Sequence, residues 1–252
     1  MPPNHIRKFI YLLCFISFSS ILAQTEVETE AENESETIEM PKEITGSYLT
    51  FNILAPIALE TPRYRLGYIL PLGGKWMAGV DVGYGDESST VSILDRIERE
   101  DYNLYEFRAE IYYQLPVARN SIHYLSLEAG YLNHQEVLIS DFYKEETEGI
   151  RISYDSANYE RIRSALTLKY GAFFDLWDQV GLNVYYGIGI RRRNNNFTNI
   201  VAPIPEVSSN DEPNPQFQIE DEFRFGEGYF RQEGISYGFN FQLGFKLYYN
   251  FK

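Results

Sequence analysis

The stretch YGFNFQLGFKLYYNF, residues 237–251, decides the fold. Its large apolar residues share one parity: Tyr237, Phe239, Phe241, Leu243, Phe245, Leu247, Tyr249 and Phe251. The intervening positions are mostly small or polar. Strict alternation predicts a β-strand, because successive side chains of a strand point to opposite faces, whereas a helix would mix the two sets. Eight large apolar groups on one face of one strand are typical of a transmembrane barrel, with lipid outside and a polar lumen inside.

Seven earlier segments alternate in the same way. They cover residues 47–54, 64–70, 76–84, 103–115, 122–132, 165–174 and 180–191. Their lengths suit the roughly 9–11 residues of a tilted membrane strand. We therefore predict an all-β fold, a closed antiparallel eight-stranded transmembrane up-and-down β-barrel. An even strand number returns both ends of the barrel to the same side.

The connections between these segments alternate in length. Short turns at 71–75, 116–121 and 175–179 separate loops at 55–63, 85–102, 133–164 and 192–235. Short turns on one side and long loops on the other are typical of outer-membrane barrels. We predict a barrel domain at 46–252 with long extracellular loops at about 133–164 and 192–235. Alternation resumes at 136–141 and 151–154, which suggests a projecting hairpin, whereas prolines in the last loop argue against two more strands.

The N-terminal region indicates export. Arg7 and Lys8 precede an apolar run at 9–22 and a plausible cleavage site after Ala23. We predict a cleaved signal peptide at 1–23, with an uncleaved anchor as the alternative. Residues 24–45 are acidic and lack aromatic side chains, so we predict a disordered periplasmic linker. A cation-binding or partner-binding tail remains the other interpretation. The single cysteine, Cys14, lies within the predicted signal.

The last strand resembles the C-terminal assembly signal of Gram-negative outer-membrane β-barrel families. The residues that carry the resemblance are Gln242, Gly244, Leu247 and Tyr249, extended by Phe251; a final Lys252 departs from the usual terminal aromatic residue. By pattern and strand count over 46–252, the chain is most similar to OmpA-like and OmpX-like barrels and to the outer membrane protein beta-barrel domain group. The resemblance implies an outer-membrane location, contact with lipid and lipopolysaccharide, and delivery by the barrel assembly machinery. We expect a monomer.

Charged residues on lumen parity are the candidate functional residues. An eight-stranded barrel is only wide enough for its own side chains, so charges inside must pair or be hydrated. Either they form a salt-bridged plug, or Glu110, Glu128 and Lys169 meet at one level in an ion or solute pathway. Glycines of the same parity either make room for large rings such as Tyr124 and Tyr185 or relieve curvature. The predicted lumen charges are Arg65, Asp81, Glu106, Arg108, Glu110, Glu128, Lys169, Arg191 and Lys246.

Other functions have weaker support in the sequence. A formal net charge of −14 without a basic patch argues against nucleic-acid binding. No nucleophile and base are expected to converge on the outer face, so we predict no enzyme and no cofactor. His134, Glu136 and Asp141 have a nonspecific spacing, and a solvated loop is favoured over a metal site. The leading prediction is a plugged structural or surface-interaction barrel. The alternatives are a narrow channel and, third, a lipid A-modifying enzyme.

Overall fold

The computed structural model describes residues 46–58, 61–87, 100–116, 121–145, 150–206 and 231–251. The chain divides into two compact units, Met1–Glu39 and Met40–Lys252, and the second contains every described residue. The predicted signal peptide at 1–23 and the acidic linker at 24–45 therefore lie outside the described residues. Within the described ranges, no helix is long and apolar enough to cross a membrane.

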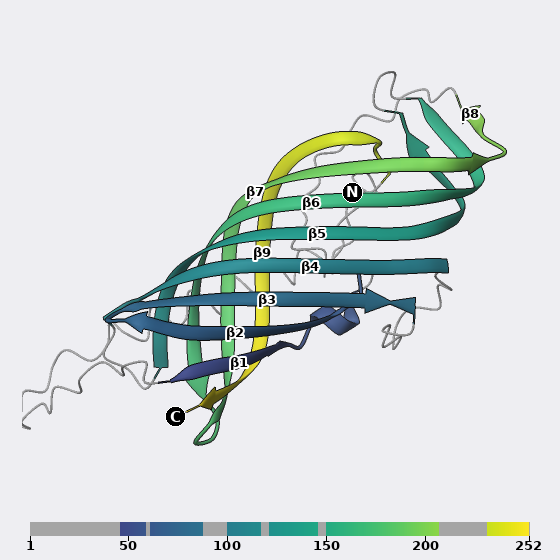
Figure 1. Cartoon of the computed structure of the whole chain (residues 1–252). Helices are drawn as coiled ribbons and strands as arrows, with labels where there is room; N and C mark the ends of the chain where they lie inside the picture. Colours follow the sequence, from purple (N-terminus) through teal and green to yellow (C-terminus); the bar gives the residue numbers. More distant parts are fainter. Residues whose placement is uncertain are drawn as a thin grey trace, which may run out of the picture. The chain divides into compact units, whose positions relative to one another are not determined.

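The second unit is a closed antiparallel β-barrel (Figure 1). Each barrel strand pairs with the next along the chain, except that β7 pairs with β9, and β9 closes the barrel on β1. The predicted all-β, eight-stranded barrel fold is thus confirmed. The barrel strands are β1 (Ser47–Asn52), β2 (Tyr64–Gly73), β3 (Trp76–Asp86), β4 (Glu100–Gln114), β5 (Ser121–Lys144), β6 (Arg151–Asp175), β7 (Val180–Val201) and β9 (Gly234–Phe251).

Alternation along the strands separates two very different faces. In β9, Asn240, Gln242, Gly244, Lys246 and Tyr248 are buried inside, while the apolar residues between them point outward. The same division holds for the middle of β3 and β4, where valine, phenylalanine and isoleucine side chains are exposed and Asp81, Glu106, Arg108 and Glu110 are buried. This arrangement inverts the usual rule for a protein in water, in which large apolar side chains are inside and charged ones outside.

Three strands are much longer than predicted. β5, β6 and β7 contain 24, 25 and 22 residues. The predicted loop at 133–164 is therefore mostly strand, and so is the first part of the predicted loop at 192–235. The local reason is that alternation continues through these polar stretches, as the projecting hairpin at 136–141 and 151–154 anticipated. A three-residue strand, β8 (Ile204–Glu206), pairs with β6 despite its proline.

The long strands form a sheet that continues beyond the barrel. The last β5 residue paired with β4 is Val137, and the last β7 residue paired with β9 is Asn195. Past these positions β6 pairs with β5 on one side and with β7 on the other, and β8 follows β7 along β6 (Figure 1). We call this part the sheet extension (described residues 138–145, 150–158 and 196–206). The end of the barrel from which it projects is called the loop end, and the opposite end is called the turn end.

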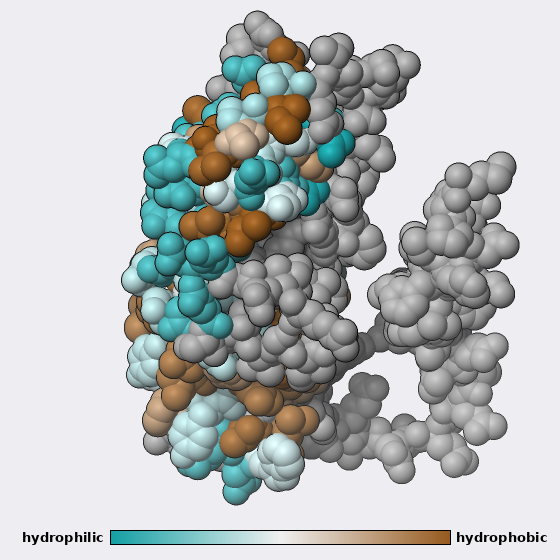
Figure 2. Space-filling model, turned by 90° about the vertical axis from the view of Figure 1, so that its right-hand side faces the viewer, coloured by the Kyte–Doolittle hydropathy of each residue, from teal (hydrophilic) through white to brown (hydrophobic). Residues whose placement is uncertain are grey.

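Aromatic residues stabilise the sheet extension from within. Tyr143, Tyr154, Tyr159 and Phe197 form a buried cluster, and the Tyr143 and Phe197 rings stack with centroids 4.7 Å apart. Burial, and next the Asp141 carboxylate, raises the pKa of the Tyr154 phenol, which therefore stays neutral. Figure 2 shows this end of the unit, where hydrophilic and hydrophobic residues are interspersed on the surface.

Segment 231–233 fastens the sheet extension to the barrel. The Arg231 side chain forms an ion pair with Asp141 (2.9 Å) and lies over the Phe142 ring. The backbone N–H of Lys144 donates to the Arg231 carbonyl, and Asn195 Nδ2 donates to the Gln232 carbonyl (2.9 Å). One short segment thus contacts both β5 and β7, which β6 separates in the sheet.

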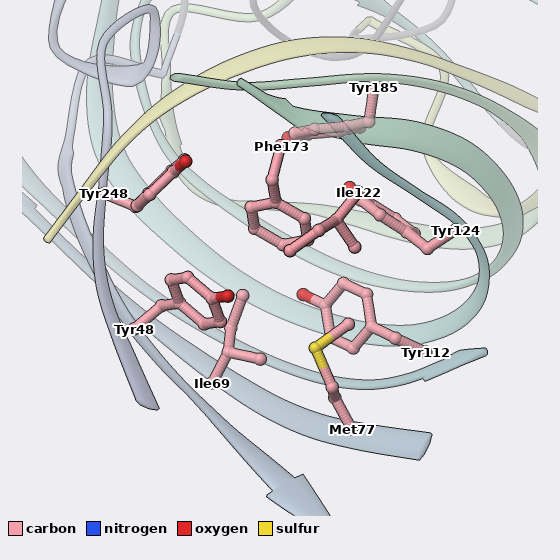
Figure 3. Packing of buried hydrophobic residues seen from close by; sticks show 9 residues of the cluster. All are labelled: Tyr48, Ile69, Met77, Tyr112, Ile122, Tyr124, Phe173, Tyr185 and Tyr248. Atoms are coloured by element: carbon pink, nitrogen blue, oxygen red, sulfur yellow. The ribbon is translucent and has the colours of Figure 1, made fainter. Parts of the chain in front are cut away.

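A cluster of rings fills the barrel at the turn end (Figure 3). Phe173 lies at its centre, with ring centroids 5.2 Å from Tyr48, 5.1 Å from Tyr124 and 5.5 Å from Tyr248. All of these side chains point inward from different strands, so the cluster spans the lumen. We call it the aromatic plug: Tyr48, Ile69, Met77, Tyr112, Ile122, Tyr124, Phe173, Tyr185 and Tyr248.

Glycines on the inner face make room for these rings. A Cβ at Gly244 would overlap the Tyr185 ring, and one at Gly171 would overlap Tyr124. Of the two roles open from the sequence, the structure supports the provision of space at these positions.

Gly244→Ala is expected to lower the free energy of unfolding of the refolded barrel by about 1–3 kcal/mol, the usual effect of overpacking. Urea unfolding in an uncharged detergent would measure it. The control is Gly238→Ala, on the same strand and face, because a Cβ there meets its nearest neighbour, Arg191 Nε, at 3.6 Å. In a Tyr185→Leu background the Gly244→Ala effect should shrink; an unchanged effect would contradict the ring overlap.

Candidate functional site

The candidate site is a network of buried charges in the middle of the lumen. All nine lumen charges predicted from the sequence are at most 5% exposed, on the inner faces of β2–β7 and β9. Alternation sets which face each occupies, and barrel closure brings them together.

Lys169 joins the two acids with which it was expected to meet. Its Nζ lies 3.3 Å from Glu110 Oε2 and also forms an ion pair with Glu128. Glu110 accepts a further hydrogen bond from the Tyr112 hydroxyl (2.8 Å), and Glu128 accepts one from Gln242 Nε2 (3.0 Å). Both carboxylates are therefore held by several donors, as buried charges require.

Glu106 is the most heavily coordinated acid of the lumen. Its Oε2 lies 2.7 Å from the Nε atoms of both Arg63 and Arg65. Its Oε1 lies 2.8 Å from Arg108 Nη2 and 3.6 Å from Arg163 Nη2. Arg108 also reaches Glu128 (3.0 Å), so ion pairs run continuously from Glu106 through Arg108 and Glu128 to Lys169.

A separate ion pair crosses the lumen. Lys246 Nζ on β9 lies 2.7 Å from Asp81 Oδ2 on β3. The ammonium groups of Lys169 and Lys246 lie 4.4 Å and 5.6 Å from the centre of the Tyr185 ring. Tyr185 therefore connects the charge network to the aromatic plug.

Three of the acids are close enough to hold a metal ion. Oxygens of Asp81, Glu110 and Glu128 all lie within 4.8 Å of one another and are buried. Lys246 and Lys169 already place ammonium groups on these oxygens. The two lysines thus supply the positive charge that a metal ion would bring.

Four further buried arginines were missed in the sequence. Arg63 precedes β2, while Arg161, Arg163 and Arg193 lie in stretches predicted to be loops. All four are at most 4% exposed. For three of them parity was the signal that could have found them: Arg193 continues the alternation of β7 beyond Arg191, and Arg161 and Arg163 continue that of β6.

The considered metal cluster of His134, Glu136 and Asp141 does not assemble. His134 is buried and its Nε2 lies 3.5 Å from Glu136 Oε1, whereas Asp141 pairs with Arg231. These residues lie in β5 rather than in the solvated loop favoured from the sequence.

A serine and a histidine do converge outside the lumen, contrary to expectation. Ser121 Oγ lies 2.9 Å from His123 Nε2, and His123 Nδ1 lies 2.7 Å from the Tyr170 hydroxyl. Both Ser121 and His123 are only 9% exposed. A catalytic triad normally orients its histidine through a carboxylate or an amide, whereas here the third group is a phenol. The arrangement therefore gives little support to nucleophilic catalysis.

The residues of the predicted assembly signal divide between the two faces. Gln242 and Gly244 face the lumen. Gln242 donates a hydrogen bond to Glu128, and Gly244 leaves room for the Tyr185 ring. Leu247, Tyr249 and Phe251 point outward and are each about 40–50% exposed. Gln242 and Gly244 thus have structural roles inside the barrel, whereas the other three residues of the motif form part of its outer surface.

Taken together, ion pairs and rings occupy the lumen at two successive levels. The geometry can hold a barrel closed and rigid, and it leaves the sheet extension as the largest projecting surface of the described residues. The comparisons with known proteins found no family model, no curated protein and no solved structure that matches this chain.

Proposed function

We propose that this protein is a non-enzymatic, plugged barrel of the Gram-negative outer membrane that presents its sheet extension to a binding partner. The observation that carries the proposal is the contrast between a lumen filled by ion pairs and rings and three strands that continue well beyond it.

The outer face of the barrel supports residence in a membrane. On β3, Trp76 and Tyr84 bracket Val80 and Val82, and all four are about half exposed. The eight residue-to-residue steps from Trp76 to Tyr84 span about 26 Å along a strand, which a usual barrel tilt reduces to about 20 Å, close to the apolar band of outer-membrane barrels. Rings on adjacent strands pair at both limits: Trp76 with Tyr113 (4.9 Å) and Tyr84 with Tyr105 (5.4 Å).

The outward face becomes polar where the strands leave the barrel. On β7, exposed Tyr186, Ile188 and Ile190 are followed on the same parity by Arg192, Asn194 and Asn196. A membrane strand needs only about 9–11 residues, so half of β5, β6 and β7 exceeds that requirement. We infer that this half stands outside the membrane, in contact with water and with lipopolysaccharide at the outer surface.

The remaining parts of the proposal follow from the sequence. The signal at 1–23 would export the chain, and the motif from Gln242 to Phe251 would be recognised by the barrel assembly machinery. The described residues need no second copy to close the barrel, in keeping with a monomer. The acidic linker would remain in the periplasm.

A narrow channel for ions or small solutes is the second candidate. It is favoured by the buried oxygens Asn240 Oδ1 and Gln242 Oε1, for which the described residues provide no hydrogen-bond donor. Buried polar atoms of this kind are commonly satisfied by water, and a hydrated lumen is the first requirement of a conducting path.

The refolded wild-type protein is expected to show no reproducible single-channel conductance in a planar bilayer, because the aromatic plug and the charge network obstruct the lumen. Heat-dependent mobility on a gel would show that the same sample is folded. Discrete, repeatable conductance steps from folded protein would overturn the plugged barrel and favour the channel.

The interaction role needs its own test. A variant in which a short Gly-Ser turn replaces residues 139–153 would remove the tip of the sheet extension and retain the parts of β5 and β6 that pair within the barrel. Loss of surface binding to cells or envelope fractions, with gel mobility unchanged, would support the role. Equal binding by both proteins would refute it, and altered lipid A on deletion of the gene would instead favour the enzyme.

A further inference from the structure

Side-chain amides are concentrated on the outer surface of the loop end. Cross-strand pairing places them in three adjacent rows across β4, β5, β6 and β7. Their neighbours along each strand, such as Arg193, Asn195 and Phe197 on β7, are buried inside, so these side chains point outward. We call the whole set the amide face: Asn103, Asn133, Gln135, Asn158, Glu160, Asn194, Asn196 and Thr198.

The amide face is almost neutral, although the whole chain has a formal net charge of −14. Glu160 is its one charged member, and it accepts a hydrogen bond from Gln135 Nε2 (3.3 Å). The exposed side chains of Asn158, Asn196 and Thr198 form no hydrogen bond with another described residue. Their donors and acceptors are therefore available to a ligand outside the barrel.

The amide face lies directly beyond the apolar part of the same outer surface. On β4, the outward residues change from exposed Phe107 and Tyr105 to Asn103 toward the loop end. On β5, they change from exposed Tyr131 to Asn133. In the proposed membrane, this neutral polar surface begins where the lipid chains end and the head groups begin.

Tyrosine rings border the amide face on its apolar side. Tyr105 is the cross-strand partner of Asn133, and Tyr237 is that of Arg192, one row nearer the apolar surface. The two rings are 55% and 74% exposed. A tyrosine ring presents an apolar face with a polar hydroxyl at its edge, so it can pack on the C–H groups of a sugar at the boundary of lipid and water.

We propose that the amide face binds the neutral sugar groups of glycolipids in the outer leaflet. An amide donates through its N–H groups and accepts through its oxygen, and a sugar hydroxyl does both, so the two groups match without any charge. A phosphate head group would instead select arginine or lysine, and the amide face contains neither. The inference rests on the proposed membrane location and adds the chemistry of the contact.

Two uncharged detergents with the same alkyl chain provide the test. Dodecyl maltoside presents a neutral disaccharide, whereas a dodecyl polyoxyethylene ether presents no sugar. The refolded full chain in the ether would be titrated with the maltoside, and its unfolding temperature followed. A saturable rise is expected, because a group that binds only the folded state stabilises it. No saturable rise from a folded barrel would overturn the proposal.

The variants locate the contact. Asn194→Ala/Asn196→Ala should lose about half of the rise, because two amides and their hydrogen bonds to the sugar are removed. Arg192→Gln, on the same strand and the same outward face, is the matched control and should show the full rise. A full rise in the double variant, or its loss in Arg192→Gln, would place the sugar elsewhere and refute the amide face.

Folding and membrane location have separate readouts. Heat-dependent gel mobility would show that each variant is folded, and Asn196→Ala alone would replace the double variant if that one did not fold. A barrel that inserts into lipid vesicles but shows no rise with maltoside would refute the sugar contact and leave the membrane location in place. Failure of the folded chain to insert would refute the location itself.

Discussion

Replacing Glu106 by glutamine is expected to lower the free energy of unfolding by about 3–5 kcal/mol, the usual effect of removing one partner from a buried ion pair. The expected loss is at the upper end because one carboxylate serves Arg63, Arg65 and Arg108 at 2.7–2.8 Å. Without it, these guanidinium groups repel one another in a space with little water. Reversible urea unfolding of the refolded barrel in an uncharged detergent would measure the change.

A control substitution on the same strand distinguishes the effect of losing a buried charge from the effect of losing any negative charge. Glu100 begins β4 and is exposed, so Glu100→Gln should change the free energy by no more than about 0.5 kcal/mol. If Glu106→Gln also changed it by less than about 1 kcal/mol, Glu106 would not be the centre of the network. In that case the arginines would depend mainly on other partners.

Truncation of Phe173, the residue at the centre of the aromatic plug, is the second substitution for which we expect a large loss of stability. Phe173→Ala should lower the free energy of unfolding by about 3–5 kcal/mol, because it removes a ring in contact with Tyr48, Tyr124 and Tyr248 and leaves a cavity. Phe173 is 1% exposed, so little of the cavity can be filled by rearrangement of a surface loop. Reversible urea unfolding of the refolded barrel in an uncharged detergent would measure this change as well.

The adjacent residue provides the matched control. Phe174 has the same side chain on the same strand but points outward and is 41% exposed. Phe174→Ala should change the free energy by about 1 kcal/mol or less in detergent, because detergent can cover this ring in the folded and the unfolded chain alike. Equal effects of the two substitutions would mean that the rings inside the barrel do not stabilise it more than those outside.

The alternation of apolar and polar residues predicted the barrel, because it is a local property of each strand and can be read directly from the sequence. Whether Gly244 or Phe245 faces inward depends only on parity along β9, and parity can be read from the sequence. For the same reason, parity alone assigned the nine lumen charges to the inner face, where they lie. Polarity misled where it was used to end strands: residues 192–197 and 161–164 were predicted to be loop, yet their alternation continues the strands.

The contacts between side chains across the lumen could not be predicted from this alternation. Lys246 meets Asp81 across the barrel, and Tyr48 stacks on Phe173 from another wall. Neither contact joins residues on neighbouring strands, so no sequence period specifies it. Such contacts depend on the stagger with which strands pair and on the closure of β9 against β1.

The sequence by itself therefore determined the class of fold, the strand order and the face on which each side chain lies, because these follow from a period of two and from connection lengths. The tertiary structure alone decided which charges pair and that Glu106 holds several arginines together. The physical reason is that a closed barrel brings side chains from distant strands into one narrow, poorly hydrated space. Only the register of the closed sheet says which of them meet.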